Sequence, residues 1–267
     1  MSRYAPIFAR CRAEGRIAFG GFLMLGHPSP GATPALLDAL VAGGADMVEL
    51  GIPFSDPVAD GPVIARAGKE ALDAGVTPAD CLAMVADFRA RHPAVPVGIL
   101  TYANIVMARG IARFAGELAA AGADSLLVAD VPSLEAEPWA RAVAAAGIDP
   151  VLIAATNTPR AALTRIARLG RGYTYCVARA GVTGAGIAPA LDHGALFADL
   201  AELGAPPPVL GFGIAEPDHV RAAATAGAAG VISGSALVER AAEGPDALRQ
   251  RVSELASATG TLQPLLT

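Results

Sequence analysis

The sequence predicts an α/β fold: a single (β/α)8 barrel (TIM barrel) with extra helices, which takes up residues 1–267 as one domain. Three observations support this prediction. They are eight short apolar runs, helical stretches between these runs, and glycines at several helix-to-run junctions. Near-continuously apolar runs are typical of parallel strands that are buried on both faces. Eight strand–helix units in about 250 residues favour a closed barrel over an open sheet.

The predicted strands are the eight apolar runs at about 18–25, 46–50, 95–100, 125–129, 150–154, 172–177, 208–212 and 230–233. The predicted helices lie at 34–43, 62–74, 78–91, 111–121, 135–146, 159–168, 194–203, 216–226 and 245–257. The interval between the second and third strands is the widest, and we expect an extra helix there. Four junction glycines are expected to take the left-handed conformation that closes a helix: Gly44, Gly122, Gly147 and Gly227.

Composition narrows the class of protein. The formal charge of −5 and the pI of about 5.4 make nucleic acid an unexpected partner. The three cysteines are far apart, and we expect reduced, mostly buried thiols rather than disulfides or a zinc site. The longest apolar run near the N-terminus has about 8 residues, against about 18 for a membrane span. We therefore expect a cytoplasmic protein that does not bind membranes.

Acidic residues collect at and after the second predicted strand. Glu49 lies within the strand, where burial would raise its pKa and equip it to move protons near neutral pH. The alternative is a buried acid paired with an arginine. The next loop, 53–62, holds Asp56 and Asp60 between three prolines. Either acid could instead form a turn or cap the helix that begins at Pro62.

Glycine-rich segments follow the last three predicted strands. Loops after the seventh and eighth strands of such barrels commonly bind phosphate through backbone amides. Gly213 follows the seventh strand, and Gly234 and Ser235 follow the eighth. Ser235 is placed to cap a helix and to donate its hydroxyl. The alternative is a set of turn glycines without a ligand.

The residues that are missing narrow the chemistry further. The only lysine, Lys69, is expected on the outer side of a helix, which argues against a Schiff-base mechanism. No HxH or HxxxH pair occurs, and we interpret His27, which stands alone, as a loop residue rather than a metal ligand. We therefore expect no metal site. Acid–base catalysis by carboxylates is the chemistry that remains.

The segment from Glu49 to Pro62, ELGIPFSDPVADGP, resembles the signature of the tryptophan synthase alpha subunit family. Further resemblances follow in the same order along the chain, at 102–104, 127–132, 179–184, 211–214 and 232–236. The resemblance implies retro-aldol cleavage of indole-3-glycerol phosphate to indole and D-glyceraldehyde 3-phosphate, in tryptophan biosynthesis.

The resemblance also implies roles for individual residues. Glu49 would be the main proton shuttle, and Asp60 would bind the indole N–H and stabilise positive charge on the ring. The indole pocket would be lined by Phe22, Leu100, Leu127, Ile153 and Tyr175. The phosphate would be held by Gly184, Gly213, Gly234 and Ser235. Thr183 and the loop after it would close over the site and exclude water.

The family's partner is a beta subunit that carries pyridoxal phosphate and receives indole through a tunnel, so an α₂β₂ heterotetramer and no cofactor in this chain are expected. The loops around Asp56 and Asn104 would face that partner. Three positions depart from the family pattern. Ile105 and Gly21 stand where proline is common, and His27 stands where an acid or tyrosine is usual. These departures bear on coupling to the partner more than on catalysis.

Three other functions remain open at this stage. The first is a free-standing lyase of the same fold that acts without a beta subunit. The second is another phosphate-binding barrel, such as an indoleglycerol phosphate synthase or a thiazole- or thiamine-phosphate enzyme. The third is a catalytically silent barrel that serves as an allosteric subunit.

Overall fold

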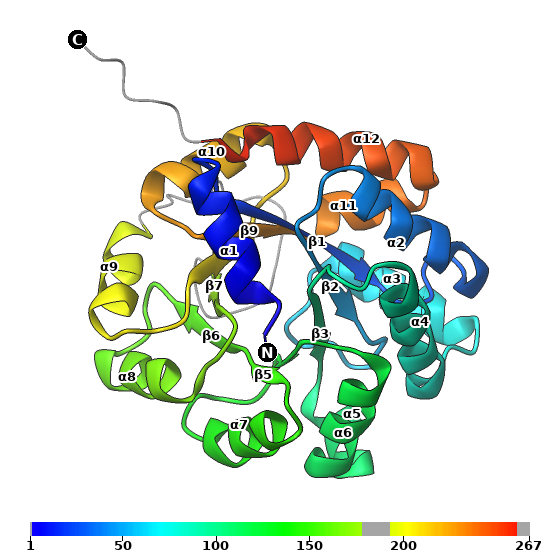
Figure 1. Ribbon diagram of the computed structural model, residues 1–267. Coiled ribbons are helices and arrows are strands. Elements are labelled where there is room, and N and C mark those ends of the chain that lie inside the picture. Colours follow the sequence, from blue (N-terminus) through cyan, green and yellow to red (C-terminus); the bar gives the residue numbers. More distant parts are fainter. Residues whose placement is uncertain (1, 178–192, 261–267) are drawn as a thin grey trace.

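Parallel strands form the centre of the structure, and helices surround them (Figure 1). The computed structural model describes residues 2–177 and 193–260. The strands lie in one sheet, in the order β5-β4-β3-β2-β1-β9-β8-β7-β6. They are β1 (Ala18–Met24), β2 (Met47–Gly51), β3 (Val97–Thr101), β4 (Ser125–Val128), β5 (Asp149–Pro150), β6 (Leu152–Ala155), β7 (Thr174–Val177), β8 (Pro208–Leu210) and β9 (Gly230–Ser233).

The barrel closes through its fifth predicted strand, which is divided at Val151 into β5 and β6. β5 pairs with β4, and β6 pairs with β7, so the two ends of the strand order are neighbours in the chain. The Val151 N–H donates to the Leu126 carbonyl over 3.0 Å and carries the pairing across the break. The (β/α)8 barrel is therefore confirmed, and the ninth strand is one half of an expected one.

The helices are α1 (Tyr4–Ala13), α2 (Thr33–Ala42), α3 (Pro62–Asp73), α4 (Pro78–Arg91), α5 (Ala103–Arg109), α6 (Ile111–Ala121), α7 (Ala136–Ala145), α8 (Arg160–Leu169), α9 (Gly194–Glu202), α10 (Pro217–Ala226), α11 (Ser235–Ala241) and α12 (Pro245–Ala256). Nine of these match the predicted helices. The extra helix expected between the second and third strands is confirmed, because α3 and α4 both lie there. Three helices, α1, α5 and α11, lie outside the predicted ranges.

The four junction glycines close helices as predicted. Gly44, Gly122, Gly147 and Gly227 have φ angles of 104°, 89°, 80° and 95°. A residue with a Cβ rarely adopts this left-handed backbone, and glycine takes it at no steric cost. Each glycine therefore ends a helix and turns the chain back toward the next strand.

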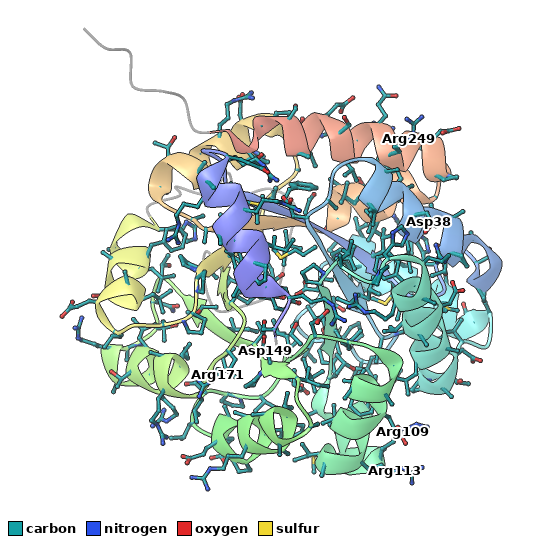
Figure 2. The ribbon with its side chains drawn as sticks, in the orientation of Figure 1. Asp38, Arg109, Arg113, Asp149, Arg171 and Arg249 are labelled. Carbon is teal, nitrogen blue, oxygen red and sulfur yellow. The ribbon has the colours of Figure 1, made fainter. Side chains whose placement is uncertain are left out.

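Helix α1 covers the end of the barrel where the strands begin (Figure 1). The Tyr4 hydroxyl lies 2.8 Å from that of Ser125, the first residue of β4, and the Tyr4 ring packs edge-on against Tyr173 at 5.1 Å. Asp149 lies at this same end, near the middle of the barrel in Figure 2, and accepts a hydrogen bond from Ser2. The opposite end, where the strands finish, is thereby left for ligands.

Aspartates at the beginning of two strands fasten this covered end. Asp124, just before β4, is paired with Arg3 and Arg89 at 2.6 Å each and accepts the Val97 N–H over 2.8 Å. Asp46, just before β2, makes the same set of contacts with two arginines and the backbone of β1. Both carboxylates are buried, and each ties a strand to its neighbour and to α1.

Three cysteines and the single lysine lie where the sequence predicts them. Cys11, Cys81 and Cys176 are free and buried. Lys69 is exposed on α3 and pairs with Asp73 one turn later. Within residues 2–177 and 193–260, no helix combines the length and the apolar character that a membrane crossing requires.

Candidate active site

A cavity of about 330 Å³ opens among the loops at the carboxyl ends of the strands. All five residues expected to form an indole pocket line it, namely Phe22, Leu100, Leu127, Ile153 and Tyr175. They come from five different strands and are up to 153 positions apart in the sequence, and the barrel brings them together. The cavity is thus an apolar pocket at the end of the barrel where enzymes of this fold act.

Strand register explains why these side chains meet. Leu100 pairs with Leu127, and Ile153 pairs with Tyr175, as neighbours in parallel strands. Residues in register point to the same side of a sheet, because side chains alternate with a period of two. The Tyr175 hydroxyl also donates to the Gly211 carbonyl over 3.0 Å, which fixes the ring. A Cβ at Gly211 would lie 2.0 Å from that ring, so only glycine fits there.

Glu49 lies buried within the barrel, next to the pocket. It pairs in register with Phe22 and with Gly98, and Leu100 lies two residues further along β3 toward the pocket. Glu49 is 2% exposed and is not among the residues that line the cavity. Its side chain points toward the covered end, where Oε1 accepts a hydrogen bond of 2.9 Å from Tyr173.

Burial raises the pKa of Glu49 to about 7. The Tyr173 hydroxyl acts in the opposite direction, and the negative charge of Asp60 raises the pKa further. Oε2 accepts no hydrogen bond from any residue in the described part of the chain. The alternative of a buried acid paired with an arginine is therefore wrong, and the carboxyl can exchange a proton near neutral pH.

Asp60 lines the cavity and has a raised pKa as well. Burial raises the pKa of this carboxyl to about 6, and the neighbouring Tyr102 hydroxyl lowers it. Tyr102 holds the loop in place, because its oxygen accepts the Ala59 N–H over 3.2 Å and its ring stacks on Phe54 at 5.1 Å. A carboxyl group thus faces a mostly apolar pocket from a loop that these contacts hold in place, and Ser235 and Glu239 are further polar residues of the wall.

The capping alternative for the two loop aspartates is wrong. Gly61 occupies the cap position of α3, which receives no side-chain hydrogen bond. Asp56 lies exposed on the surface, where it accepts a hydrogen bond from Ser55. The two acids therefore have different environments, with Asp60 facing the cavity and Asp56 facing outward.

The loops after β8 and β9 line the rest of the cavity. Gly213, Gly234 and Ser235 all contribute to the wall, and Gly213 has a φ angle of 75° that favours glycine. The Ser233 hydroxyl donates to the Ile214 carbonyl over 2.7 Å and joins the two loops. Ser235 does not cap a helix as predicted, because Gly234 takes the cap position and Ser235 is the first residue of α11. Gly184 and Thr183 lie outside the described residues.

Sequence reasoning missed two tyrosines of the site. Tyr173 contacts Glu49, and Tyr102 contacts the loop that carries Asp60. Tyr173 and Tyr175 are two positions apart near the same strand, so the period of two could have indicated that both point into the barrel. Among the described residues, no group of three or more His, Cys, Asp or Glu side chains is placed to hold a metal ion.

Two predicted partner-facing residues, Asp56 and Asn104, are both exposed at the carboxyl end of the barrel. Large exposed hydrophobic residues lie in the same segments. Val58 follows β2, Met107 follows β3 and Leu134 follows β4, and they are 67%, 62% and 68% exposed. Side chains of this kind, carried by the segments that follow three neighbouring strands, are typical of a protein-binding surface.

The three departures from the family pattern have local explanations in part. A Cβ at Gly21 would lie 2.8 Å from the Leu40 side chain, so the tight packing of α2 on β1 favours glycine. His27 is a buried loop residue whose Nδ1 lies 3.1 Å from a Glu70 carboxylate oxygen. Ile105 is partly buried and packs against the core.

The fold and this cavity define a class of protein: a (β/α)8-barrel enzyme with a mostly apolar pocket at the carboxyl ends of its strands and two carboxyl groups of raised pKa, Asp60 in the pocket wall and Glu49 buried in the barrel. A family model described as tryptophan synthase alpha chain matches residues 8–266. The chain therefore belongs to the tryptophan synthase alpha chain family. Its reaction is that of this subunit, the cleavage of indole-3-glycerol phosphate by a lyase of tryptophan biosynthesis.

Relatives and solved structures agree with this assignment. The tryptophan synthase alpha chain of Shewanella amazonensis is 49% identical over 257 residues, which cover 96% of this chain and 97% of that one. That of Klebsiella pneumoniae subsp. pneumoniae is 48% identical over 268 residues, 98% of this chain and 100% of the other.

The structure is similar to a chain of Mycobacterium tuberculosis tryptophan synthase, with a TM-score of 0.89, 36% identity, and coverage of 97% and 98%. Tryptophan synthase subunit alpha from Legionella pneumophila gives a TM-score of 0.85 at 30% identity, with coverage of 97% and 98%. The alternative of a different phosphate-binding barrel is therefore wrong.

Proposed function

We propose that the cavity at the carboxyl ends of the strands is where this chain cleaves indole-3-glycerol phosphate, with Glu49 as proton shuttle and Asp60 as the group that stabilises the ring. The observation that carries this proposal is the pairing of two carboxyl groups, with pKa values of about 7 and about 6, with an apolar pocket of about 330 Å³. The pocket has the size of a small-molecule site and suits a flat aromatic ring.

The proposed reaction needs only these groups. Protonated Glu49 gives its proton to C3 of the indole, and the ring becomes a cation whose N–H is held by ionised Asp60. Glu49, now a carboxylate, accepts the proton of the glycerol hydroxyl next to the ring. The carbon–carbon bond then breaks, its electron pair returns to the ring, and an aldehyde forms. Because the protonated ring is the electron sink, neither a lysine nor a metal is required.

This mechanism requires Glu49 to turn from Tyr173 toward the pocket. Glu49 pairs in register with Phe22 of the pocket wall, and only one of its carboxyl oxygens is engaged in a hydrogen bond with a described residue. A glutamate side chain has several rotatable bonds, so its carboxyl can change direction while the backbone of the strand stays in place. The proposal therefore assigns Tyr173 the role of a resting partner for the carboxyl, outside the reacting atoms.

We assign the phosphate to the end of the cavity formed by the loops after β8 and β9. Backbone amides of Gly213, Gly234 and Ser235 would donate to it, together with the Ser235 hydroxyl. The same proposal gives Gly184 a phosphate contact and Thr183 a place in the loop that closes over the substrate. For Gly184 and Thr183 the proposal depends on the family motif alone.

We also propose a beta subunit as partner, in an α₂β₂ heterotetramer in the cytoplasm, with pyridoxal phosphate held by the partner and no cofactor in this chain. The surface with Asp56 and Asn104 would face it. The exposed side chains of Val58, Met107 and Leu134, on the segments that follow the neighbouring strands β2, β3 and β4, support this placement. A single domain over residues 1–267 is part of the proposal, and the nine strands found among the described residues support it because they lie in one sheet.

The test is indole release from indole-3-glycerol phosphate by the purified chain, measured with and without a tryptophan synthase beta subunit. We expect slow turnover that rises steeply with the partner. Fast turnover by the chain alone would instead identify a free-standing lyase. The departure from the family pattern at Ile105 would then be explained by the lack of a beta subunit to couple to. No indole under either condition would contradict the proposed site and favour a silent subunit.

A further inference from the structure

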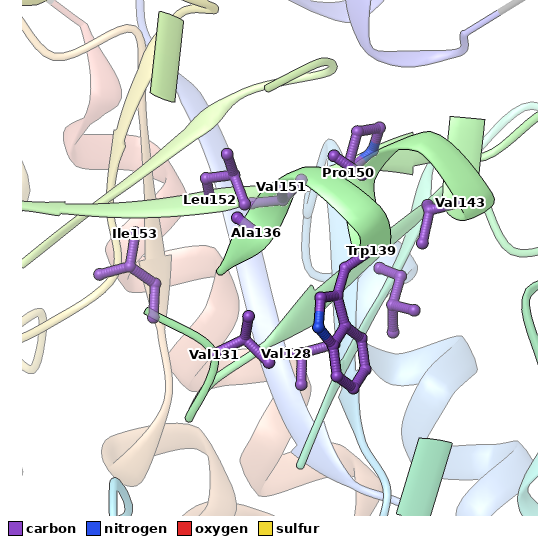
Figure 3. A pocket seen from close by; sticks show the side chains of 11 residues that line it. Val128, Val131, Ala136, Trp139, Val143, Pro150, Val151, Leu152 and Ile153 are labelled. Carbon is purple, nitrogen blue, oxygen red and sulfur yellow. The ribbon is translucent and has the colours of Figure 1, made fainter. Parts of the chain in front are cut away.

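Ile153 lines two cavities rather than one. Besides the pocket of about 330 Å³, it borders a second cavity of about 30 Å³ between helix α7 and strands β4 to β6. Figure 3 shows Ile153 at one edge of this second group of side chains and Trp139 toward the other edge. We call this cavity the annex, and its lining residues are Leu126, Val128, Val131, Ala136, Trp139, Ala140, Val143, Pro150, Val151, Leu152 and Ile153.

The chemistry of the annex selects an apolar occupant. None of its eleven lining side chains carries a charge, a hydroxyl or an amide, and the indole N–H of Trp139 is the one polar group they offer. Backbone polar atoms also contribute to the wall, but a buried water needs two to four polar partners, so these side chains make the space better suited to apolar atoms. Since a water needs roughly 10–15 Å³ on this scale of volume, the annex of about 30 Å³ has room for roughly two or three heavy atoms.

Ile153 is a stiff part of the boundary between the annex and the larger pocket. A β-branched side chain has few χ1 rotamers, so it does not easily swing aside. Its neighbour in register, Tyr175, is held by the hydrogen bond from its hydroxyl to the Gly211 carbonyl. A ligand in the larger pocket therefore meets fixed side chains on this side, with unfilled apolar space behind one of them.

We propose that Ile153 determines substrate specificity by closing the annex, and that the annex accepts a methyl- or chlorine-sized substituent on the indole ring once this side chain is shortened. This inference rests on the proposed function, because it takes the larger pocket to be the place of the indole ring. With Ile153 intact, a ring substituent pointing toward β6 meets the side chain. Without it, the substituent has an apolar space to fill.

A matched control is available in the same pocket. Leu127 lines the larger pocket but does not line the annex, and it carries as many side-chain carbons as Ile153. Leu127→Ala therefore removes the same number of atoms without opening the annex. A second control fills the annex from the helix side. Ala136 is fully buried and lines the annex alone, so Ala136→Leu occupies it without touching the larger pocket.

The experiment compares kcat/KM for indole-3-glycerol phosphate and for its four derivatives that carry one methyl group on the benzene ring. The full chain is assayed with a beta subunit as wild type, I153A, L127A, A136L and the double variant I153A/A136L. We expect I153A to raise the ratio of one methylated substrate to the parent about tenfold or more, the size of effect that one methylene produces in an apolar pocket. L127A should not raise that ratio at the same ring position, and A136L should cancel the gain in I153A.

The outcomes separate this inference from the proposed function. Turnover of the parent substrate by wild type and A136L, with unchanged thermal unfolding, shows that the site works and that the fold tolerates a filled annex. The inference is overturned if no ring position gains in I153A, if L127A gives the same gain, or if the gain survives A136L. Loss of all turnover in wild type would contradict the proposed function instead.

Discussion

The Tyr173 hydroxyl donates a hydrogen bond of 2.9 Å to Oε1 of Glu49, deep inside the barrel. Both side chains are buried, and the second oxygen of the carboxyl is unengaged by the residues that the structure describes. Burial drives the pKa of Glu49 up to about 7, while the tyrosine holds it down. Burial and this hydrogen bond together give Glu49 a pKa at which its carboxyl can act both as an acid and as a base at neutral pH.

Replacing Glu49 by glutamine tests the role of this carboxyl directly. We expect Glu49→Gln to lower kcat by about 10²–10⁴-fold, the usual contribution of a general acid–base group, while KM stays near the wild-type value. Glutamine keeps the shape and can still accept the hydrogen bond from Tyr173, but it cannot give up or take a proton. Steady-state kinetics of indole release provide the measurement, and full activity in this variant would rule out the proposed mechanism.

The pH profile of kcat/KM should be bell-shaped with its maximum between about pH 6 and pH 7. Activity should rise as Asp60 ionises, with a pKa of about 6, and fall as Glu49 loses its proton, with a pKa of about 7. The two limbs belong to the interacting pair rather than to isolated groups. Removing the Tyr173 hydroxyl removes a group that lowers the pKa of Glu49, so Tyr173→Phe should move the alkaline limb to higher pH.

Tyr4→Phe is the matched control for that shift. The Tyr4 hydroxyl is buried beside the Tyr173 ring but is bonded to Ser125, so its loss leaves the direct partner of Glu49 in place. The alkaline limb of Tyr4→Phe should stay at the wild-type pH. An equal shift in both variants would show that the change comes from loosened packing and not from the lost hydrogen bond.

Glu49 should also make the fold less stable as pH rises. Its pKa is about 7 in the folded chain and 4.5 in the unfolded chain, so the folded state holds a proton between these values that the unfolded state has lost. Stability therefore falls from pH 4.5 to pH 7. Relative to wild type, Glu49→Gln should gain up to roughly 3 kcal/mol in the free energy of unfolding across this window. Urea unfolding at pH 4.5 and pH 8 measures it, and a pH-independent difference would contradict the raised pKa.

Asp60→Asn should cause a severe but incomplete loss of activity. Asparagine can still accept a hydrogen bond from the indole N–H, but it carries no charge to stabilise the ring cation. Losses of about 10²–10³-fold in kcat are typical when one such electrostatic group is removed. The acid limb of the pH profile should disappear in this variant. If the acid limb remains at pH 6, a group other than Asp60 produces it.

The strand positions could be predicted because they depend on local pattern, and the ends of the apolar runs mark where the site lies. The side chains of Leu100, Leu127 and Ile153, which the family resemblance implies for the indole pocket, line the cavity at that end. The break in the fifth strand had a signal too, since Pro150 has no N–H to continue a ladder. Helix α1 also had one: Tyr4, Ile7, Phe8 and Cys11 follow helical spacing and are all buried.

Other features depend on contacts that no local pattern reveals. Glu49 and Tyr173 are 124 positions apart, and their hydrogen bond exists only because the barrel closes. The annex behind Ile153 arises from the way that α7 packs on the strands, and small residues such as Ala136 and Ala140 leave it unfilled. Ser235 lies one position inside its helix instead of capping it, a difference of the size that sequence patterns do not resolve.

The carboxylate of Asp124 should stabilise the end of the barrel that α1 covers. Its side chain is 4% exposed and balances Arg3 and Arg89, and Asp124→Asn leaves two cations without a counter-ion. Removing one partner of a fully buried ion pair costs about 3 kcal/mol or more, and because Arg3 is partly exposed while Arg89 is mostly buried, the cost here should lie between that value and the cost of a surface pair. The matched control is Asp218→Asn, which breaks the exposed pair with Arg221 and should cost less than about 1 kcal/mol.

Urea unfolding measures the cost of both variants. In Asp124→Asn, kcat at low temperature should be unchanged because Asp124 lies at the end opposite the cavity. Equal costs for the two variants would show that the Asp124 network does not hold α1 to the strands.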